Sequence, residues 1–103
     1  MTNKFHAIRT TVDGIEFASK AEANRYCTLK LMQKAGLISQ CELQPVFPIV
    51  INGVKIGKYI ADFRYIENGE QIVEDCKGVK TPVYRLKCKM VKALYGVTIR
   101  ETK

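Results

Sequence analysis

The alternation of apolar and polar positions changes its period several times along the chain. Residues 8–17 indicate a β-hairpin, because two short alternating runs flank Asp13-Gly14, a dipeptide typical of a two-residue hairpin turn. The capping-box sequence SKAE at residues 19–22 then begins a run of apolar residues at helical spacing. Because glycine commonly follows the last turn of a helix, we expect this helix to end just before Gly36.

The middle of the chain predicts three extended segments. Residues 43–51 form the first, and its two prolines favour the edge of a sheet or a bulge. Residues 58–66 and 71–77 alternate in the manner of β-strands and are separated by turn residues at 67–70. A meander of three strands is therefore expected here.

The C-terminal third predicts a second helix and a last strand. Thr81-Pro82 is a helix N-cap followed by proline at the first helical position, and Gly96 marks the end. Four apolar residues at helical spacing are expected to face the core: Val83, Leu86, Met90 and Leu94. Residues 97–100 form a short strand. The element order predicts one domain, residues 1–103, of α/β (α+β mixed) class with a central mixed β-sheet flanked by helices.

The composition narrows the choice of partners and of compartment. A net charge of +7 and a pI near 9.4 favour an anionic partner, most often nucleic acid. The first residues have no apolar secretion segment, and no apolar run is long enough to span a membrane, so we expect a cytoplasmic protein. Four cysteines without C-x-x-C spacing, beside a single histidine, are expected to be reduced thiols rather than zinc ligands.

Acidic residues are expected to meet across the second and third strands of the meander. Counting back from the turn places Asp62 opposite Asp75 on one face of the sheet, with Lys77 two residues further along. Glu74 and Cys76 point to the other face. Two converging carboxylates suit a hard divalent ion such as Mg²⁺, which can activate water and neutralise charge on a phosphodiester. The alternative is a solvated face on which Lys77 pairs with one aspartate.

The first helix offers a third acid. Glu22 lies in its first turn and is a candidate metal ligand, but it is also the capping-box glutamate that bonds back to Ser19. The two roles can coexist, because capping occupies one carboxylate oxygen.

Basic and aromatic residues near these acids are candidate contacts to phosphate groups. The second helix supplies Tyr84, Arg85, Lys87, Lys89 and Lys92, and the N-terminal segment supplies Lys4, His6 and Arg9. A solvated helix surface explains the lysines equally well.

The segments VDGIEFASKAEANRY, AGLISQCELQPVF, YIADFRY, VEDCKG and TPVYRLKCKMVKALYGVTI together resemble the DUF1064 family of small phage and prophage proteins. The resemblance extends from about Phe5 to Glu101, and this family is grouped with the PD-(D/E)xK nucleases. It implies a restriction-endonuclease-like core, here with an N-terminal β-hairpin, and metal-dependent cleavage of DNA. It also implies that Asp62, Asp75 and Glu22 bind the metal ion and that Lys77 is the catalytic lysine. Ala61 replaces the proline of the motif, a common departure.

These observations predict a Mg²⁺-dependent endodeoxyribonuclease, with Mn²⁺ as a substitute, that acts on phage DNA in the bacterial host. A chain this short offers little surface for reading base sequence, so we expect recognition of branched or junction DNA by a homodimer. One alternative is a non-catalytic basic module that binds nucleic acid, and another is a structural basic protein.

Overall fold

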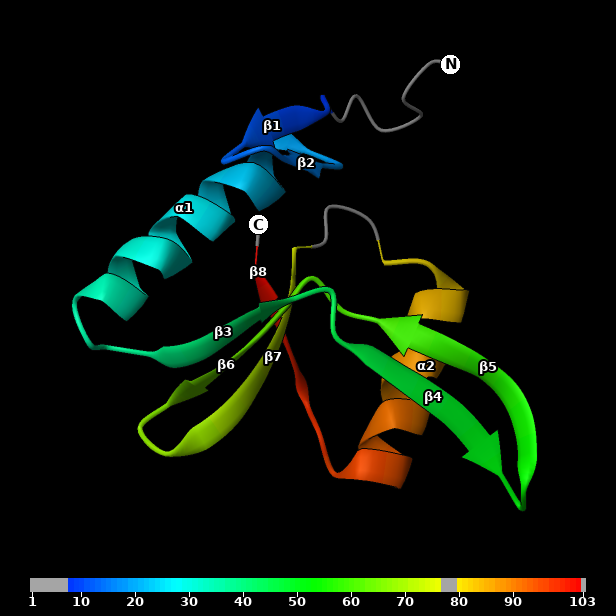
Figure 1. Cartoon of the computed structure of the whole chain (residues 1–103). Coiled ribbons are helices and arrows are strands. Elements are labelled where there is room, and N and C mark those ends of the chain that lie inside the picture. Colours follow the sequence, from blue (N-terminus) through cyan, green and yellow to red (C-terminus); the bar gives the residue numbers. More distant parts are fainter. Residues whose placement is uncertain (1–7, 77–79, 103) are drawn as a thin grey trace.

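The computed structural model describes residues 8–76 and 80–102. These residues form two helices and eight strands, whose arrangement is shown in Figure 1. In chain order they are β1 (Thr10–Val12), β2 (Ile15–Phe17), α1 (Lys20–Lys34), β3 (Ser39–Leu43), β4 (Val46–Ile51), β5 (Val54–Ile60), β6 (Phe63–Glu67), β7 (Glu70–Cys76), α2 (Pro82–Tyr95) and β8 (Ile99–Thr102).

A four-stranded mixed sheet forms the centre of the fold, in the strand order β3-β6-β7-β8. β3, β6 and β7 pair antiparallel, whereas β8 lies parallel to β7 after the crossover through α2. The side chains of successive residues point to opposite faces, and Phe63 and Tyr65 of β6 pack with α1 while Val73 of β7 packs with α2. The predicted mixed α+β class, with helices flanking a central sheet, is therefore confirmed.

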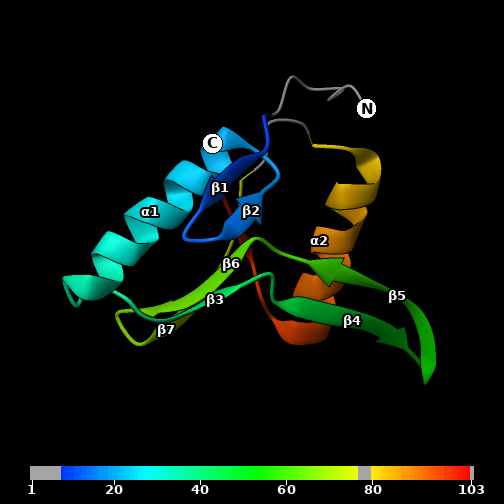
Figure 2. The same cartoon turned by 45° about the horizontal axis from the view of Figure 1, so that its top comes forward.

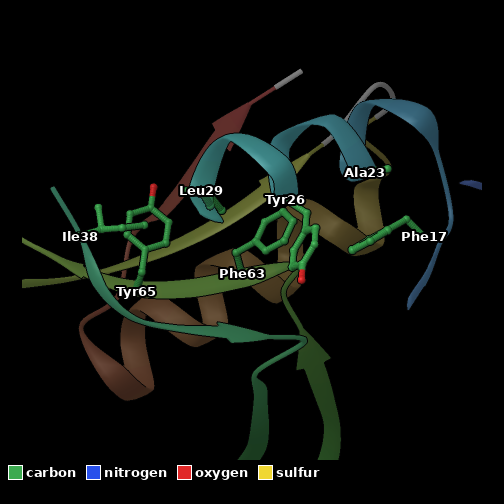
Figure 3. Close-up of a cluster of buried hydrophobic side chains, with 7 residues drawn as sticks. All are labelled: Phe17, Ala23, Tyr26, Leu29, Ile38, Phe63 and Tyr65. Carbon is green, nitrogen blue, oxygen red and sulfur yellow. The ribbon is translucent and has the colours of Figure 1, made fainter. Parts of the chain in front are cut away.

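The N-terminal hairpin and α1 form as their turn and cap residues predict. Asp13 and Gly14 both adopt positive φ, 53° and 75°, so that Val12 pairs directly with Ile15. The Ser19 hydroxyl accepts a hydrogen bond of 3.1 Å from the backbone N–H of Glu22 and thereby starts the helix. The first core gathers between this unit and the sheet (Figure 3) and comprises Phe17, Ala23, Tyr26, Leu29, Ile38, Phe63 and Tyr65.

The second helix has the predicted ends, but its inner face is turned by about a quarter-turn from the predicted one. Thr81 caps α2 and Gly96 ends it with a φ of 70°, as predicted. Tyr84 and Val91 are buried, however, at 8% and 0% exposure, whereas Val83 and Leu86 are 62% and 56% exposed. Met90 packs against the second core as predicted, but the prediction is wrong for Val83, Leu86 and Leu94. The helix carries two apolar stripes, and periodicity alone does not decide which one packs against the sheet.

The strand predicted over residues 58–66 is wrong as a single element. The chain leaves one sheet and enters another at Ala61-Asp62, so the first part becomes β5 and the second part becomes β6. Backbone hydrogen bonds hold this crossing point: the N–H of Gln44 donates to the carbonyl of Asp62 over 3.0 Å, and the N–H of Ala61 donates to the carbonyl of Pro45 over 3.1 Å.

The segment predicted over residues 43–51 also divides. Its first residue belongs to β3 in the central sheet, and the rest is β4, which pairs only with β5. This β4–β5 hairpin extends away from the central sheet in both views (Figures 1 and 2). The radius of gyration, 14.6 Å, exceeds the value of about 13 Å typical of a compact chain of this length, as a projecting hairpin would produce.

Two further expectations concern the last strand and the cysteines. β8 begins two residues later than predicted, at Ile99. All four cysteines are free. In the described part of the chain, neither helix has the length and apolar character needed to cross a membrane.

Candidate active site at the end of the central strands

Two neighbouring acids, Glu74 and Asp75, are buried near the end of β7, at 0% and 1% exposure. Since successive strand residues point to opposite faces, Glu74 lies on the α1 side of the sheet and Asp75 on the α2 side. The predicted separation of the two acids onto opposite faces is therefore confirmed. The two carboxylates have different hydrogen-bond partners, which are described in turn for Glu74 and Asp75.

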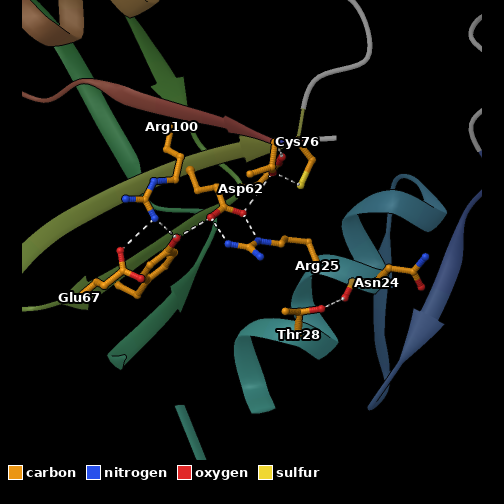
Figure 4. Close-up of polar contacts among 10 residues, drawn as sticks. Asn24, Arg25, Thr28, Asp62, Glu67, Cys76 and Arg100 are labelled. Carbon is orange, nitrogen blue, oxygen red and sulfur yellow. Dashed lines mark hydrogen bonds and ion pairs between the residues drawn. The ribbon is translucent and has the colours of Figure 1, made fainter. Parts of the chain in front are cut away.

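The carboxylate of Glu74 anchors α1 to the sheet. Arg25 donates to both of its oxygens, from Nε over 2.6 Å and from Nη2 over 2.9 Å. The Tyr65 hydroxyl donates over 2.6 Å and the Thr102 hydroxyl over 3.3 Å. Arg100 donates to the Tyr65 hydroxyl over 3.3 Å, and Figure 4 shows Arg25 and Arg100 approaching from opposite sides. Glu74 is thus a buried acid whose acceptor capacity is used by structural partners.

The pKa of Glu74 reflects this environment. Burial by itself would raise the pKa of the carboxyl, but the hydrogen bonds from Arg25 and Tyr65 outweigh burial and hold the pKa below its ordinary value. Glu74 is therefore ionised at neutral pH, in a paired and hydrogen-bonded form that a buried carboxylate requires.

Asp75 is held on the opposite face by the β4–β5 hairpin. The Tyr59 hydroxyl of β5 donates to Oδ2 of Asp75, in a buried contact. Burial, followed by this hydrogen bond to a carboxylate, raises the pKa of Tyr59, so the phenol stays protonated and acts as a donor. The contact connects the hairpin to the end of the central sheet and fixes the orientation of the Asp75 side chain.

Removal of the Tyr59 hydroxyl tests this connection. Tyr59→Phe should lower the free energy of unfolding by about 1–2 kcal/mol, because it leaves a buried carboxylate oxygen without its donor. Urea titration monitored by circular dichroism would measure the change. Tyr95→Phe is the matched control, since the Tyr95 hydroxyl bonds to the carbonyl of Pro48 at an exposed position; an equal loss in both variants would contradict the special role of Tyr59.

Asp62 immediately precedes β6 and lies beside the end of β7. The predicted register is confirmed from Glu67 to Phe63, where the paired ladder ends at Glu74. The backbone N–H of Asp62 still donates to the carbonyl of Glu74 over 3.2 Å, and the next step of the same register, Asp62 beside Asp75, stays a prediction. The carboxylate of Asp62 accepts a hydrogen bond of 2.8 Å from the backbone N–H of Cys76 (Figure 4).

The pKa of the Cys76 thiol depends on the acidic residues near this end of the sheet. Burial raises the pKa of the thiol to about 11, and the negative charges of Asp62, Glu74 and Glu22 add to the increase. Glu22, whose backbone N–H is capped by Ser19, therefore lies within electrostatic range of the strand end. The charge of Glu22, in the first turn of α1, thus acts on Cys76 at the end of β7.

One acid at this end of the sheet was not predicted. The parallel pairing of β7 with β8 sets Glu101 directly beside Asp75. Its carboxylate accepts a hydrogen bond of 2.8 Å from Tyr84 and forms an ion pair of 2.9 Å with Lys80. These partners lower the pKa of Glu101, with Lys80 as the largest cause. Only the register of a strand pair formed through a long crossover could have indicated this neighbour.

The chemistry of the donors can be compared with the needs of a divalent ion. Carboxylate oxygens are the ligands that Mg²⁺ prefers, so Asp62, Asp75 and Glu22 fit such an ion in kind. Among residues 8–76 and 80–102, however, no three acidic, histidine or cysteine side chains gather closely enough to hold one ion. The Tyr59 hydroxyl and the Cys76 N–H each bond to the Oδ2 atom of one aspartate, and because a carboxylate has two oxygens these hydrogen bonds are compatible with metal binding.

The residues predicted to contact phosphate groups differ in their exposure to solvent. Arg85 and Lys89 are exposed on α2, and Lys87 is partly buried. Tyr84 is wrong as a surface contact, because its ring is buried in the second core between β5 and α2. Arg9 is exposed and forms an ion pair with Glu16 of the neighbouring strand. Lys77, Lys4 and His6 lie outside the described residues.

The fold and the site together define a small α+β protein with carboxylates near the ends of the two central strands and a helix with exposed basic residues on one face of the sheet. The chain belongs to the family described as protein of unknown function (DUF1064), and the match covers residues 2–102. No curated protein matches the chain.

Proposed function

We propose that this protein is a metal-dependent DNA endonuclease with a PD-(D/E)xK core, acting on phage or prophage DNA in the cytoplasm of a bacterial host. The observation that carries the proposal is the position of Asp75, a carboxylate buried at the end of the central strand in a chain of net charge +7. Asp62 lies beside the same strand end, at the start of β6. A protein that only bound phosphates would gain nothing from acids beneath its basic helix, because they repel the ligand.

The residues have distinct roles in this proposal. Asp62 and Asp75 would hold a divalent ion, with Glu22 as a third ligand or as the acid that adjusts it. When bound, Mg²⁺ supplies a water of lowered pKa and offsets negative charge on the phosphodiester. Lys77, the residue two positions after Asp75, would act on the attacking water or on the charge that develops at phosphorus. Glu74 has a structural role, because Arg25, Tyr65 and Thr102 already occupy its carboxylate.

The test is a cleavage assay on linear, nicked and four-way-junction DNA in the presence of Mg²⁺, Mn²⁺ or EDTA. Cleavage with either metal and none with EDTA is the expected result, and preference for the junction would identify the substrate as branched DNA. DNA binding without cleavage of any substrate would instead favour the alternative of a non-catalytic nucleic-acid-binding module.

The basic flank of α2, defined as Arg85, Lys89 and Lys92, should contribute affinity for DNA without sequence reading. All three side chains are exposed on the same side of the helix. In the triple variant Arg85→Gln/Lys89→Gln/Lys92→Gln, DNA binding should weaken about tenfold or more at low salt. In a plot of the logarithm of the DNA association constant against the logarithm of the salt concentration, the slope should become shallower by about 2–3 if each residue contacts one phosphate.

Fluorescence anisotropy with labelled DNA over a range of salt concentrations would measure both quantities. Lys20→Gln/Lys34→Gln on α1 is the control for net charge, since both lysines are exposed and lie at the two ends of the other helix. An equal loss per charge removed in the two variants would show that the flank is not a specific contact surface.

A further inference from the structure

A hollow of about 350 Å³ lies between β5 and the N-terminal half of α2. These two elements lie against one another in both views (Figures 1 and 2), and their inward side chains share the second core. The volume is at the lower end of the range that is typical of ligand sites. Most of the side chains that line the hollow are exposed, so it is open to solvent and can take one segment of an extended ligand.

Two lysines from different elements line this hollow, Lys58 of β5 and Lys87 of α2. Lys87 is partly buried, yet neither ammonium forms an ion pair or a hydrogen bond with the residues that the structure describes. Of the described residues that line the hollow, none is acidic. Because like charges repel and a charge withdrawn from water is normally paired, this arrangement favours an anionic ligand.

The other polar side chains of the hollow carry no charge. The Thr81 hydroxyl accepts the cap hydrogen bond of 3.1 Å from the N–H of Tyr84, which leaves its own proton to donate. Burial raises the pKa of Tyr59 and of Tyr84, so both phenols stay neutral at physiological pH. The hollow therefore presents two positive charges and a hydroxyl donor, a combination that suits a phosphate group.

The two tyrosines connect the hollow to the proposed catalytic acids. The rings of Tyr59 and Tyr84 line the hollow and have their centroids 6.2 Å apart. The hydroxyl of Tyr59 donates to Asp75. The hydroxyl of Tyr84 donates over 2.8 Å to Glu101, which lies beside Asp75 in the register of β7 and β8. The hollow and the proposed metal site are therefore neighbours.

The hollow is separate from the basic flank of α2. Lys87 is about half a turn away from Arg85, Lys89 and Lys92 around the helix axis. α2 thus has two basic surfaces, and the hollow is the one that Tyr59 connects to Asp75.

We propose that this hollow, which we call the phosphate hollow, is a subsite for one backbone phosphate of the DNA strand that enters the proposed catalytic site. Lys58 and Lys87 pair with the phosphate from two elements, and the Thr81 hydroxyl donates to it. The exposed side chains of Ile60 and Val83, which also line the hollow, give the adjoining sugar an apolar contact.

Phosphate contacts fix the position of a nucleic-acid strand without reading its sequence. The phosphate hollow therefore determines which phosphodiester of the strand reaches Asp75. The choice of DNA as the ligand rests on the proposed function, whereas the binding itself needs neither metal nor cleavage.

Equilibrium binding of labelled DNA by the full chain tests the proposal, measured by fluorescence anisotropy in EDTA on a linear duplex and on a four-way junction. Lys58→Gln/Lys87→Gln should weaken binding about tenfold at low salt. Because both lysines pair with the same phosphate, the logarithm of the association constant should depend less steeply on the logarithm of the salt concentration, with a slope shallower by about one. Lysines that contact two separate phosphates would change the slope by about two.

Lys34→Gln/Lys55→Gln is the matched control, because it removes the same number of charges. Both lysines are exposed, Lys55 belongs to the same strand as Lys58, and neither lines the hollow. The control should lose much less affinity than Lys58→Gln/Lys87→Gln. Circular dichroism verifies that both variants are folded, and calorimetric titration with inorganic phosphate tests whether the hollow instead binds the free anion.

A selective loss of affinity with a slope change of about one supports the proposal, even if the wild type cleaves no DNA. An equal loss in the control, a slope change of about two, or a wild type that does not bind DNA would overturn it. Equal DNA affinity in the wild type and Lys58→Gln/Lys87→Gln, with phosphate binding to the wild type alone, would assign the hollow to a free anion and also overturn it. Cleavage that depends on Asp75, together with unchanged affinity in Lys58→Gln/Lys87→Gln, would contradict the subsite and leave the nuclease proposal intact.

Discussion

Asp75→Asn is expected to reduce metal-dependent DNA cleavage by about a thousandfold or more, because the variant removes a charged oxygen ligand from the proposed metal site. Asparagine keeps the size of the side chain and one carbonyl oxygen for the Tyr59 hydroxyl. Asp62→Asn should have a similar effect on cleavage. Affinity for DNA should be unchanged or higher in both variants, since each removes a negative charge from beneath the basic helix. Gel assays of cleavage and anisotropy measurements of binding would separate the two quantities.

Glu70→Gln is the matched control for these variants. Glu70 is an exposed acid at the start of the same strand, so the variant removes one charge far from the proposed site and should retain full activity. Wild-type rates in both Asp75→Asn and Asp62→Asn would show that the proposed site is wrong. Because Asp62 is only half-buried, its variant gives a result even if Asp75→Asn proves unstable.

The second large effect concerns stability rather than cleavage. Arg25→Met should lower the free energy of unfolding by about 3–5 kcal/mol, because it leaves the fully buried Glu74 carboxylate without its charge partner. A domain of this size has a total stability of roughly 5–15 kcal/mol, so the variant would be close to unfolding at room temperature. Urea titration would give the free energy, and Lys30→Met, which breaks an exposed ion pair with Asp13, should leave the midpoint nearly unchanged.

A second substitution separates the ion pair from the packing around it. The double variant Arg25→Met/Glu74→Gln also removes the unpaired buried charge of Glu74, so it should recover much of the free energy of unfolding that Arg25→Met loses. If the double variant were less stable than Arg25→Met, the cost would lie in lost packing rather than in the unpaired charge.

The free energy of unfolding of the wild type should decrease at acidic pH. The pKa of Glu74 is lower in the folded protein than its ordinary value, so its contribution to stability is present at neutral pH. It is lost as the pH falls below about 4.5 and through the folded-state pKa. In Arg25→Met, burial would dominate and raise the pKa of Glu74, so acidification should narrow the difference in stability between this variant and the wild type.

The sequence predicted the elements that depend on local interactions. Asp13-Gly14 and the cap residues Ser19 and Thr81 act within a few positions of themselves, and each began or ended an element where expected. The register of β6 with β7 followed from a two-residue turn. Such features need no knowledge of the rest of the fold.

The sequence did not predict the features that depend on distant contacts. The predicted strand over residues 58–66 divides at Ala61-Asp62 because two backbone hydrogen bonds join this point to Gln44 and Pro45. The local sequence pattern does not indicate these hydrogen bonds. The inner face of α2 was predicted incorrectly because the helix has two apolar stripes. Which of them packs is decided by the aromatic contacts of Tyr84 with β5.

The candidate site was predicted in part for the same reason. Alternation along β7 correctly separated Glu74 from Asp75. Counting across the hairpin gave the correct register as far as Phe63 and Glu74, where the ladder ends. Glu101 was missed because its position beside Asp75 depends on a parallel pairing formed through α2.

The opposite orientation of Glu74 and Asp75 restricts how this family can vary in length. A one-residue insertion or deletion within β7 ahead of these acids would turn each side chain to the other face. An insertion would bring Glu74 to the position that faces Tyr59, and a deletion would bring Asp75 to the position that faces Arg25, so in either case both acids would lose their present partners. Insertions and deletions among relatives should therefore collect at the exposed turn of Asn68-Gly69, and the strand between that turn and Cys76 should keep a constant length.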